Sequence, residues 1–386
     1  WRFTQFGDKV IATDWADAIQ VKTMPGSSNF AALGGSPPRA KHLTTFRDFV
    51  VLGYTSTSAS EIAWSAINDV TGWTPGTSQS DTQLLPDGGF VQGFATGDVL
   101  LIFQQRKIRV MQYVGPPLIM QIDVIEESVG CLEAGSICQH GRKVFYLADD
   151  GFHMIDSLQA AVNIGEEKIN DFFADDLNEP YLYRMSSGVD PDKNSAYWCY
   201  PSTASTSGVP DTLLIYYWPA QKWTIIRTGV ELVFSALALG YTLEGLDVLA
   251  PSGLDLFQIP LDDPILQGGS LRFGAFSTSY TYGVFVGSTL EATIETGDIE
   301  LIPGKRAYVS GFRPVTDGDA ITGSVAARER AMDSEAYTSD GTLETHGMVS
   351  VEASGRYIRA KVVHTAADVW TTTQGLDFEY TLDGEV

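Results

Sequence analysis

The sequence predicts an all-β protein: a β-propeller of about six blades, followed by a C-terminal β-sandwich-like domain. The first observation is composition, because 16 Tyr, 19 Phe and 8 Trp accompany 38 Gly in 386 residues, and aromatic and turn-forming residues favour sheet over helix. The second is a repeated pattern of a hydrophobic strand, a short polar turn and an aromatic or β-branched strand. The third is scarce helical periodicity, which predicts a helix only at residues 165–177.

The repeated pattern predicts the blades. It is spaced at roughly 40 to 50 residues, the period of four-stranded blades that cannot bury their faces alone. Asp-Gly pairs add the positive-φ residues that tight hairpins require. The six repeats are residues 3–21, 46–64, 99–113, 144–155, 196–226 and 234–259, and the Asp-Gly pairs are at 87–88, 150–151, 317–318, 340–341 and 383–384.

A change of character near residue 268 predicts two domains, a propeller at 1–268 and a sandwich-like domain at 269–386. The polar stretch 262–264 and Gly268-Gly269 precede the change. Residues 1–4 alternate like a strand and carry neither an initiator Met nor a signal-peptide pattern, so we expect the numbering to begin inside the native protein. The later strands, whose pairing needs a sandwich or an added sheet, are expected at 290–301, 308–315, 321–327, 348–351 and 357–363.

The charge indicates what the protein does not bind. The chain has 48 acidic and 25 basic residues, a net charge of −23, and the excess is spread along its length. Phosphate binding needs clustered Lys and Arg, so we expect the chain to repel nucleic acid. Solubility alone is the alternative explanation of the acidity. No apolar run approaches the roughly 20 residues of a membrane helix, so no membrane span is expected.

We predict no catalytic, cofactor-binding or metal site. Cys131, Cys138 and Cys199 are too few for a disulfide scaffold and fit assembly in a reducing cytoplasm. They form no CxxC pair, and no histidine cluster completes a metal set. None of the histidines is paired with a GxSxG serine. The histidines are His42, His140, His153, His346 and His364.

Adjacent acidic residues are the best material for an enzyme hypothesis, that of a propeller glycosidase, since such enzymes use two carboxylates. Adjacent acids on a strand point to opposite faces, however, and those on a turn are usually solvated. Residues 65–69 with Trp73 only approximate the Asp box of sialidases. The acidic pairs are Glu126-Glu127, Asp149-Asp150, Asp175-Asp176 and Asp262-Asp263.

Two further features suggest binding. The basic run Arg106-Lys107-Ile108-Arg109 is interpreted as a charged hairpin tip that protects a sheet edge and offers a docking point to an acidic neighbour, rather than as a nucleic-acid site. Trp15, Trp64 or Trp73 could stack on sugars. A receptor- or glycan-binding propeller is therefore the first alternative function.

Segments from nearly the whole chain carry a family resemblance. The segments are residues 46–53, 62–69, 73–75, 85–89, 101–109, 130–131, 145–152, 214–218, 222–223, 290–297 and 353–357. In these segments the chain resembles the nozzle or hub proteins of short-tailed phages, also called packaged-DNA stabilisation or tail tubular proteins. The motifs are structural, so they specify the fold better than the role.

The resemblance implies a structural, non-enzymatic virion protein of the phage tail, assembled in the host cytoplasm as a homohexameric ring at the head–tail connector. The implied partners are the portal-adaptor protein of the neck, a tail fibre or tailspike, and genomic DNA that passes through the lumen during ejection without specific binding. An acidic wall suits that task, because each fixed phosphate contact would slow the DNA. Loops 201–210 and 243–253 are the candidates for constricting the channel.

Overall fold

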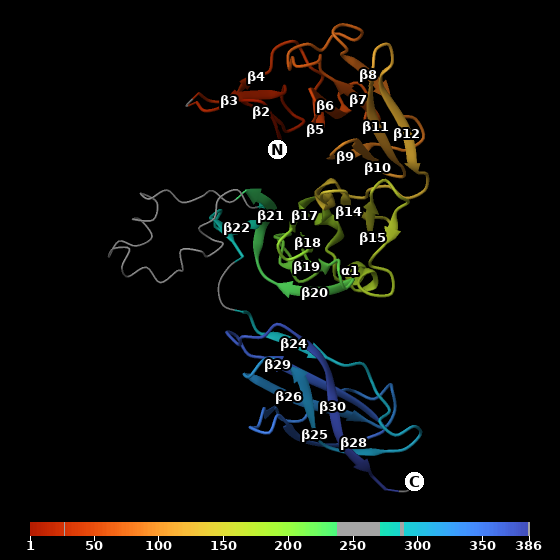
Figure 1. Ribbon diagram of the computed structural model, residues 1–386, viewed down its shortest axis with the longest axis vertical. Coiled ribbons are helices and arrows are strands. Elements are labelled where there is room, and N and C mark those ends of the chain that lie inside the picture. Colours follow the sequence, from red (N-terminus) through yellow and green to blue (C-terminus); the bar gives the residue numbers. More distant parts are fainter. Residues whose placement is uncertain (27, 238–270, 286–288, 385–386) are drawn as a thin grey trace, which may run out of the picture. The chain divides into compact units, whose positions relative to one another are not determined.

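The computed structural model describes residues 1–26, 28–237, 271–285 and 289–384 (Figure 1). The chain divides into two compact units, Trp1–Phe285 and Val286–Val386. The predicted fold class is confirmed: the first unit has six successive antiparallel sheets, the blades of a propeller, and the second has the two sheets of a sandwich. No helix in the described ranges is long and apolar enough to cross a membrane.

Blades 1 to 3 are four-stranded sheets whose strands follow one another along the chain. Blade 1 consists of β1 (Arg2–Phe6), β2 (Lys9–Thr13), β3 (Gln20–Thr23) and β4 (Ala31–Ala32). Blade 2 consists of β5 (Ala40–Phe46), β6 (Phe49–Thr55), β7 (Glu61–Trp64) and β8 (Asp81–Leu84). Blade 3 consists of β9 (Val91–Thr96), β10 (Leu100–Gln104), β11 (Ile108–Gly115) and β12 (Ile119–Glu126).

Blades 4 and 5 repeat this order, and blade 6 has three described strands. Blade 4 consists of β13 (Cys138–His140), β14 (Lys143–Ala148), β15 (Gly151–Asp156) and β16 (Val162–Asn163). Blade 5 consists of β17 (Ser186–Asp190), β18 (Ser195–Tyr200), β19 (Thr212–Tyr217) and β20 (Lys222–Arg227). Blade 6 consists of β21 (Val230–Leu237), β22 (Leu271–Ser277) and β23 (Tyr282–Val284).

Hydrophobic strands in the middle of the blades are buried on both faces. In β10, Leu100 and Ile102 join the apolar cluster shared with blade 2, whereas Leu101 and Phe103 join the cluster shared with blade 4. Side chains alternate between the faces of a strand, so a sheet packed on both sides needs a continuous apolar run. This is why the repeats contain runs such as that of β10 rather than an alternating pattern.

Five apolar clusters join the six blades in order along the chain. The cluster between blades 4 and 5 is rich in aromatic rings. Its Trp198 is fully buried, lies 4.9 Å from Phe152 between ring centroids, and donates from Nε1 to the Ser136 carbonyl at 2.9 Å. Close aromatic packing of this kind makes neighbouring blades one mechanical unit.

Neighbouring blades contact each other through their first strands. Contacts join β1 to β5, β5 to β9, β13 to β17 and β17 to β21. Between blades 3 and 4, Gln92 of β9 donates from Nε2 to the Leu132 carbonyl at 3.1 Å. The first strands therefore lie nearest the propeller axis, and polar residues on them are placed around that axis.

Helical structure is as scarce as predicted. The helix expected at residues 165–177 is shorter in the structure, where α1 is Asn170–Asp176. The 3₁₀ helices η1 (Ala134–Ser136) and η2 (Glu179–Arg184) were not expected. The Glu133 side chain accepts from the Gly135 N–H and so caps η1.

The second unit is a sandwich of two antiparallel sheets (Figure 1). Val309 and Phe312 of one sheet pack with Val325 and Ile358 of the other to form its core. One sheet has the order β24 (Ala292–Glu295), β29 (Tyr357–His364), β26 (Ile321–Arg328), β27 (Gly341–Thr342). The other has the order β28 (Val349–Gly355), β25 (Ala307–Thr316), β30 (Thr373–Leu382).

Three details of this region differ from the sequence interpretation. The units divide after Phe285 rather than after residue 268, because β22 pairs with β21 and β23 pairs with β22, so both strands belong to blade 6. Asp317-Gly318 leads from β25 to β26, which lie in different sheets, so it is a crossing between sheets and not a hairpin turn. The prediction missed β30, whose ten residues pair with β25.

Candidate functional site

The acidic pairs lie on different elements. Asp149 and Asp150 form the turn between β14 and β15, while Glu126 ends β12. Lys107 Nζ lies 2.7 Å from Glu127 Oε2, and its hydrogen bond and charge hold the pKa of Glu127 below its usual value. Asp262-Asp263 lies outside the described residues, as does the predicted gating loop 243–253. The pairs whose positions are described are thus distributed over blades 3, 4 and the α1 segment.

Asp176, at the end of α1, is tied into the protein. Arg227 binds its carboxylate through two nitrogens, at 2.8 and 2.9 Å, and Tyr200 donates its hydroxyl at 2.7 Å. Burial raises the pKa of Asp176, but the hydrogen bonds from Arg227 and Tyr200 outweigh it, so the pKa is lowered. A carboxylate held ionised between two donors anchors α1 to blade 5 and is poorly suited to proton transfer.

A cavity of about 420 Å³ is lined by exposed acidic residues and by buried apolar ones. We call it the acid-rimmed pocket. Asp149, Asp171 and Glu179 are exposed at the rim and form no ion pair with any described residue, whereas Asp150 accepts from His153 Nε2 at 2.7 Å. The floor includes Phe173. The acidic pair at 149–150 therefore faces a cavity, where it repels anions.

The three tryptophans considered for sugar stacking differ in exposure. Trp64 and Trp73 are buried, and their indole N–H groups donate to the Gln79 carbonyl at 2.8 Å and the Val70 carbonyl at 2.7 Å. They are core residues, and the sugar-stacking interpretation is wrong for both. Trp15 is 37% exposed and meets Tyr54 edge-on at 5.1 Å.

The basic run 106–109 is mostly engaged within its own blade. Arg109 donates to Gln104 Oε1 at 2.8 Å and to the Pro86 carbonyl at 2.7 Å, and Lys107 pairs with Glu127. Ile108 is buried. Of this run, which lies wholly within the described residues, only Arg106 is exposed at the hairpin tip, so the run offers one free cation rather than three.

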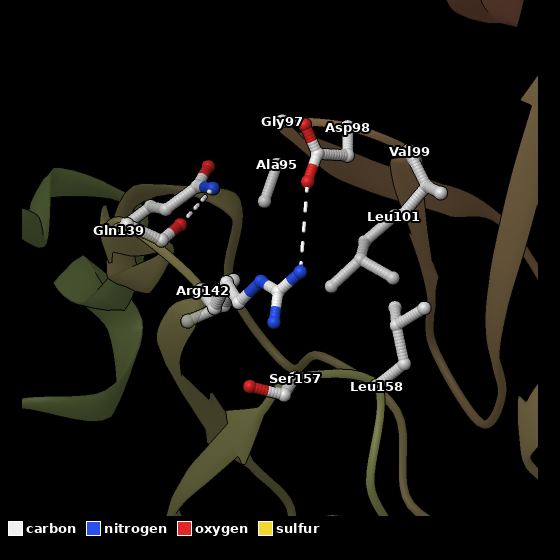
Figure 2. Close-up of a pocket in the computed structure, with 11 residues that line it drawn as sticks. Ala95, Gly97, Asp98, Val99, Leu101, Gln139, Arg142, Ser157 and Leu158 are labelled. Atoms are coloured by element: carbon white, nitrogen blue, oxygen red, sulfur yellow. Dashed lines mark hydrogen bonds and ion pairs between the residues drawn. The ribbon is translucent and has the colours of Figure 1, made fainter.

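A cleft of about 160 Å³ lies between blades 3 and 4 (Figure 2). Figure 2 shows Arg142 reaching toward Asp98 across it, with Leu101 and Leu158 on its apolar side. The ion pair measures 3.8 Å, and both side chains are largely exposed, at 75% and 91%. An exposed pair of this kind contributes little, and we regard the cleft as a groove between blades.

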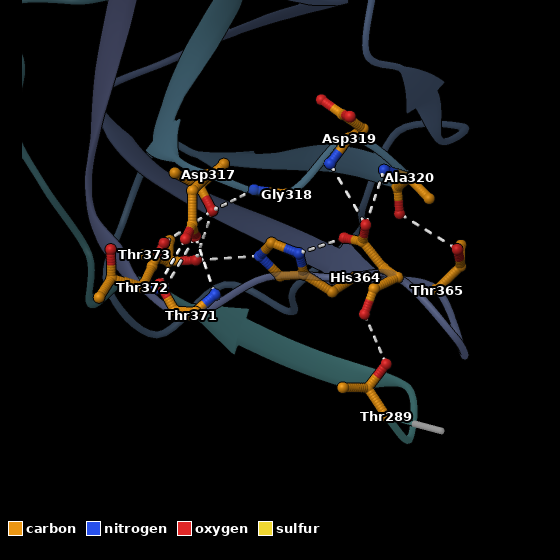
Figure 3. Close-up of polar contacts among 12 residues, drawn as sticks. Thr289, Asp317, Gly318, Asp319, Ala320, His364, Thr365, Thr371, Thr372 and Thr373 are labelled. Atoms are coloured by element: carbon orange, nitrogen blue, oxygen red, sulfur yellow. Dashed lines mark hydrogen bonds and ion pairs between the residues drawn. The ribbon is translucent and has the colours of Figure 1, made fainter. Parts of the chain in front are cut away.

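The sandwich contains a buried polar chain that resembles a catalytic triad in its order (Figure 3). Asp368 Oδ2 is 2.9 Å from His364 Nδ1, and His364 Nε2 is 2.9 Å from Thr373 Oγ1. His364 is fully buried and stacks on Trp370 at 4.3 Å. Asp368 also accepts from the N–H groups of Asp319 and Ala320 at 3.3 and 3.2 Å. The chain joins β29 to the start of β30 and leaves no substrate access to the imidazole.

The cysteines are free and buried. Burial raises the pKa of Cys131 and of Cys138 to about 12, so neither is a thiolate at neutral pH. Within the described ranges, no group of three or more His, Cys, Asp or Glu side chains could hold a metal ion.

Intramolecular ion pairs occupy much of the positive charge. In the described residues, twelve of the chain's 25 Lys and Arg side chains lie within 4 Å of a carboxylate, which is about half. The acidic residues outnumber the basic ones about twofold, so most carboxylates in the described ranges have no such partner. The net charge of −23 is therefore carried by acids that basic residues do not neutralise locally.

One pocket near the propeller axis is positively charged instead. We call it the axial pocket; Arg2 of β1, His42 and Thr44 of β5, and Gln92 of β9 line it, and its volume is about 120 Å³. His42 is 4% exposed, and its Nε2 has no hydrogen-bond partner among the described residues. Arg2 and Thr44 were not predicted as site residues from the sequence, because only the blade arrangement brings the first strands together.

Comparisons with known proteins identify no relative by sequence. No family model and no curated protein matches the chain. Among solved structures, it is similar to the designed protein Ika8 (TM-score 0.39, 9% identity, 72% of this chain and 68% of that one). It is also similar to a quinonprotein alcohol dehydrogenase-like protein from Bacteroides thetaiotaomicron (0.36, 10%, 58% and 53%) and to a fungal alcohol oxidase of the AA5 family (0.38, 10%, 97% and 84%).

The chain spans about half the length of the Bacteroides protein. At these identities and TM-scores, the similarities transfer no activity, substrate or partner to this chain.

Proposed function

We propose that the protein is a structural subunit of a phage tail nozzle or hub, which assembles as a ring and conducts and retains the packaged genome. The observation that carries the proposal is the charge distribution. Acidic residues outnumber basic ones 48 to 25, a net charge of −23, and in the described part of the chain twelve of the basic residues are already paired with carboxylates. A wall on which carboxylates outnumber cations about twofold repels phosphates, so DNA passes without being held.

The blade packing supports a mechanical role. Five apolar clusters link consecutive blades, and the one between blades 4 and 5 contains the fully buried Trp198. Close-packed interiors have low compressibility. A wall built of such blades resists the internal pressure of a packaged genome.

Ring formation is the part of the proposal that a single chain does not contain. Rings arise from heterologous contacts whose rotation closes. The resemblance to nozzle proteins supports a hexamer, with the portal adaptor and a tail fibre or tailspike as neighbours, and the virion tail as the location.

Electron microscopy of the purified protein and of the virion tail tests the proposal, with mass photometry to count subunits. We expect closed rings of six copies, and density for this chain between the neck and the tail tip. A protein that stays monomeric at micromolar concentration and is missing from the tail would refute the proposal.

A further inference from the structure

Arg2 is an exposed cation that lines the axial pocket and has no partner among the described residues. Its guanidinium makes no ion pair or hydrogen bond with any described residue, although the side chain lines the axial pocket. The surrounding protein lowers the pKa of Arg2, and the charge of Glu133 opposes that effect. Arginine stays protonated in proteins, so the pocket is lined by a positive charge that a counter-anion would stabilise.

Glu133, whose charge acts on Arg2, forms no direct pair with it in the described structure. The Glu133 carboxylate is held by the Gly135 N–H, from which Oε1 accepts at 3.2 Å. No ion pair within 4 Å joins Glu133 to Arg2 in the described structure. The cap thus holds the Glu133 carboxylate on the η1 backbone rather than on the guanidinium.

His42 supplies a second unsatisfied polar group. Its ring is 4% exposed and lines the same pocket, and Nε2 is buried without a partner among the described residues. Buried polar groups are nearly always hydrogen-bonded, so an unpartnered one calls for a water or an ion. The neutral ring can carry its proton on Nε2 and donate it.

Two further groups complete the lining. Thr44 lies two residues after His42 on β5, on the same face of the strand, and contributes a hydroxyl. Gln92 is fixed from the other side, because its amide donates to the Leu132 carbonyl at 3.1 Å. Donors from three blades thus surround one small space.

The volume limits what can occupy it. A cavity needs about 10–15 Å³ for each water, so about 120 Å³ has room for several waters or one small ion. Pockets for organic ligands of drug size start at about 300 Å³. A nucleoside or a sugar is therefore too large.

We propose that the axial pocket binds one small oxyanion, a phosphate or a carboxylate, with Arg2 as the charged donor and His42 and Thr44 as further hydrogen-bond donors. Arginine binds either oxyanion through two parallel N–H groups. The site is independent of ring formation, and it is a local exception in a strongly acidic chain.

The test is a titration of the full chain with sodium phosphate and, separately, with sodium acetate, in chloride at constant ionic strength. Calorimetry measures the affinity, and NMR of the histidine rings reports the site, since the chain has only five histidines. We expect saturable binding at millimolar or lower concentration, accompanied by a shift of the His42 ring signals. The anion that binds more tightly identifies the source chemistry.

Variants of the lining residues test whether the measured anion binding takes place in the axial pocket. Arg2→Gln should weaken binding at least tenfold, and Thr44→Val several-fold, because each removes a donor. Arg106→Gln is the matched control, since Arg106 is an exposed arginine on a different hairpin, and it should bind like the unmodified chain. A His42 signal that neither anion moves beyond the effect of chloride, or an unchanged affinity in Arg2→Gln, overturns the proposal.

Discussion

Arg328 is a charged side chain that the sandwich almost completely buries. Only 8% of the side chain is exposed, and it forms ion pairs with Asp298 and Glu335. Arg359 pairs with the same two acids, at 3.3 and 2.7 Å. Arg328 also donates to the carbonyls of Ala331 and Asp333, both at 3.1 Å. Each partner in such a network is costly to leave unpaired.

We predict that Arg328→Gln lowers the free energy of unfolding by about 2–4 kcal/mol, since two carboxylates lose a buried partner. Arg330→Gln is the control, because Arg330 is 75% exposed in its pair with Asp333 and should cost less than about 1 kcal/mol. Urea denaturation of the two variants measures the difference. Equal losses would contradict a structural role for the buried network.

His42 makes stability depend on pH. Burial, aided by the charges of Arg2 and Lys41, lowers the pKa of His42 from 6.5 to about 3. Between these values the unfolded chain binds a proton that the folded chain excludes. The contribution of His42 to stability is therefore present above about pH 6.5 and is lost progressively as the pH falls toward 3.

Between pH 6.5 and 3, protonation of His42 should lower the free energy of unfolding by at most about 1.4 kcal/mol per pH unit. Going from pH 7 to pH 4 should therefore cost the native chain about 2–3 kcal/mol more than it costs His42→Gln. Urea denaturation at both pH values measures this, with His346→Gln as the control because His346 is exposed. If His42→Gln shows the same pH dependence as the native chain, the assignment to His42 is wrong.

At the scale of elements, η1 precedes blade 4 in the chain and packs against both blade 4 and blade 5. Trp198 of β18 donates to the Ser136 carbonyl at 2.9 Å, and a Cβ added at Gly135 would lie 1.9 Å from the Met185 carbonyl oxygen. The approach of the two backbones at Gly135 leaves no room for a side chain. This short helix therefore fixes the spacing of two blades.

Two substitutions of Trp198 should separate the contribution of its packing from that of its hydrogen bond. Trp198→Ala should cost about 3–5 kcal/mol, because the cavity it leaves cannot collapse in a rigid aromatic cluster. Trp198→Phe keeps most of the packing and loses the hydrogen bond, so we expect about 1–2 kcal/mol. Thermal denaturation gives the ranking, and Trp15→Ala, at an exposed position, should be close to neutral. A phenylalanine variant as unstable as the alanine variant would contradict the cavity argument.

The loop between β18 and β19 is attached to the blade at both ends. Ser202 donates from its N–H and its hydroxyl to Asp211 at 2.7 and 2.8 Å, and Asn178 donates to the Ser205 carbonyl at 2.8 Å. Thr206 and Ser207 are exposed between these anchors. The loop is thus held firmly, and Arg184 donates to the Ser207 carbonyl at 3.4 Å, while the side chains of Thr206 and Ser207 are exposed toward a channel or a neighbour.

Deleting residues 203–208 tests a gating role. The anchors at Ser202 and Asp211 remain, so we expect the chain to fold and the virions to assemble, but to release DNA early. Nuclease-sensitive DNA in purified particles measures the release, and a variant with Thr206 and Ser207 changed to Gly controls for composition. Unchanged retention and assembly would remove this loop from consideration.

At the scale of the whole molecule, the excess of acid predicts no affinity for duplex DNA. We expect no mobility shift at 50 mM salt, about the lowest ionic strength used for such assays, because phosphate contacts are the sequence-independent source of binding. Replacing Asp149, Asp171 and Glu179 by Lys at the acid-rimmed pocket should create salt-dependent binding. A shift by the unmodified protein would count against an unobstructed conduit.

Sequence patterns were sufficient for the fold class because they are local. Asp150-Gly151 makes the turn from β14 to β15 as predicted, and continuous apolar runs such as Leu100–Phe103 do mark strands buried on both faces. The boundary after Phe285 was missed because β22 pairs with β21 across 33 intervening residues, Ala238–Ser270. That pairing is a long-range contact that no local pattern reports.

The candidate pockets could not be predicted from the sequence, because they too depend on long-range contacts. Arg2, His42 and Gln92 are separated by about forty to fifty residues each, and only the first-strand contacts bring them together. The burial of Trp64 and Trp73 could not be predicted either. A tryptophan gives the same sequence pattern whether its side chain packs in the core or faces solvent.

The most direct test of the proposed function is a high-resolution cryo-electron microscopy reconstruction of the assembled tail. The proposal predicts a ring of copies of this chain whose bore is lined mainly by carboxylates, with no cluster of unpaired arginines and lysines facing the DNA. A bore lined by unpaired basic side chains, or a tail that lacks the chain, would contradict it.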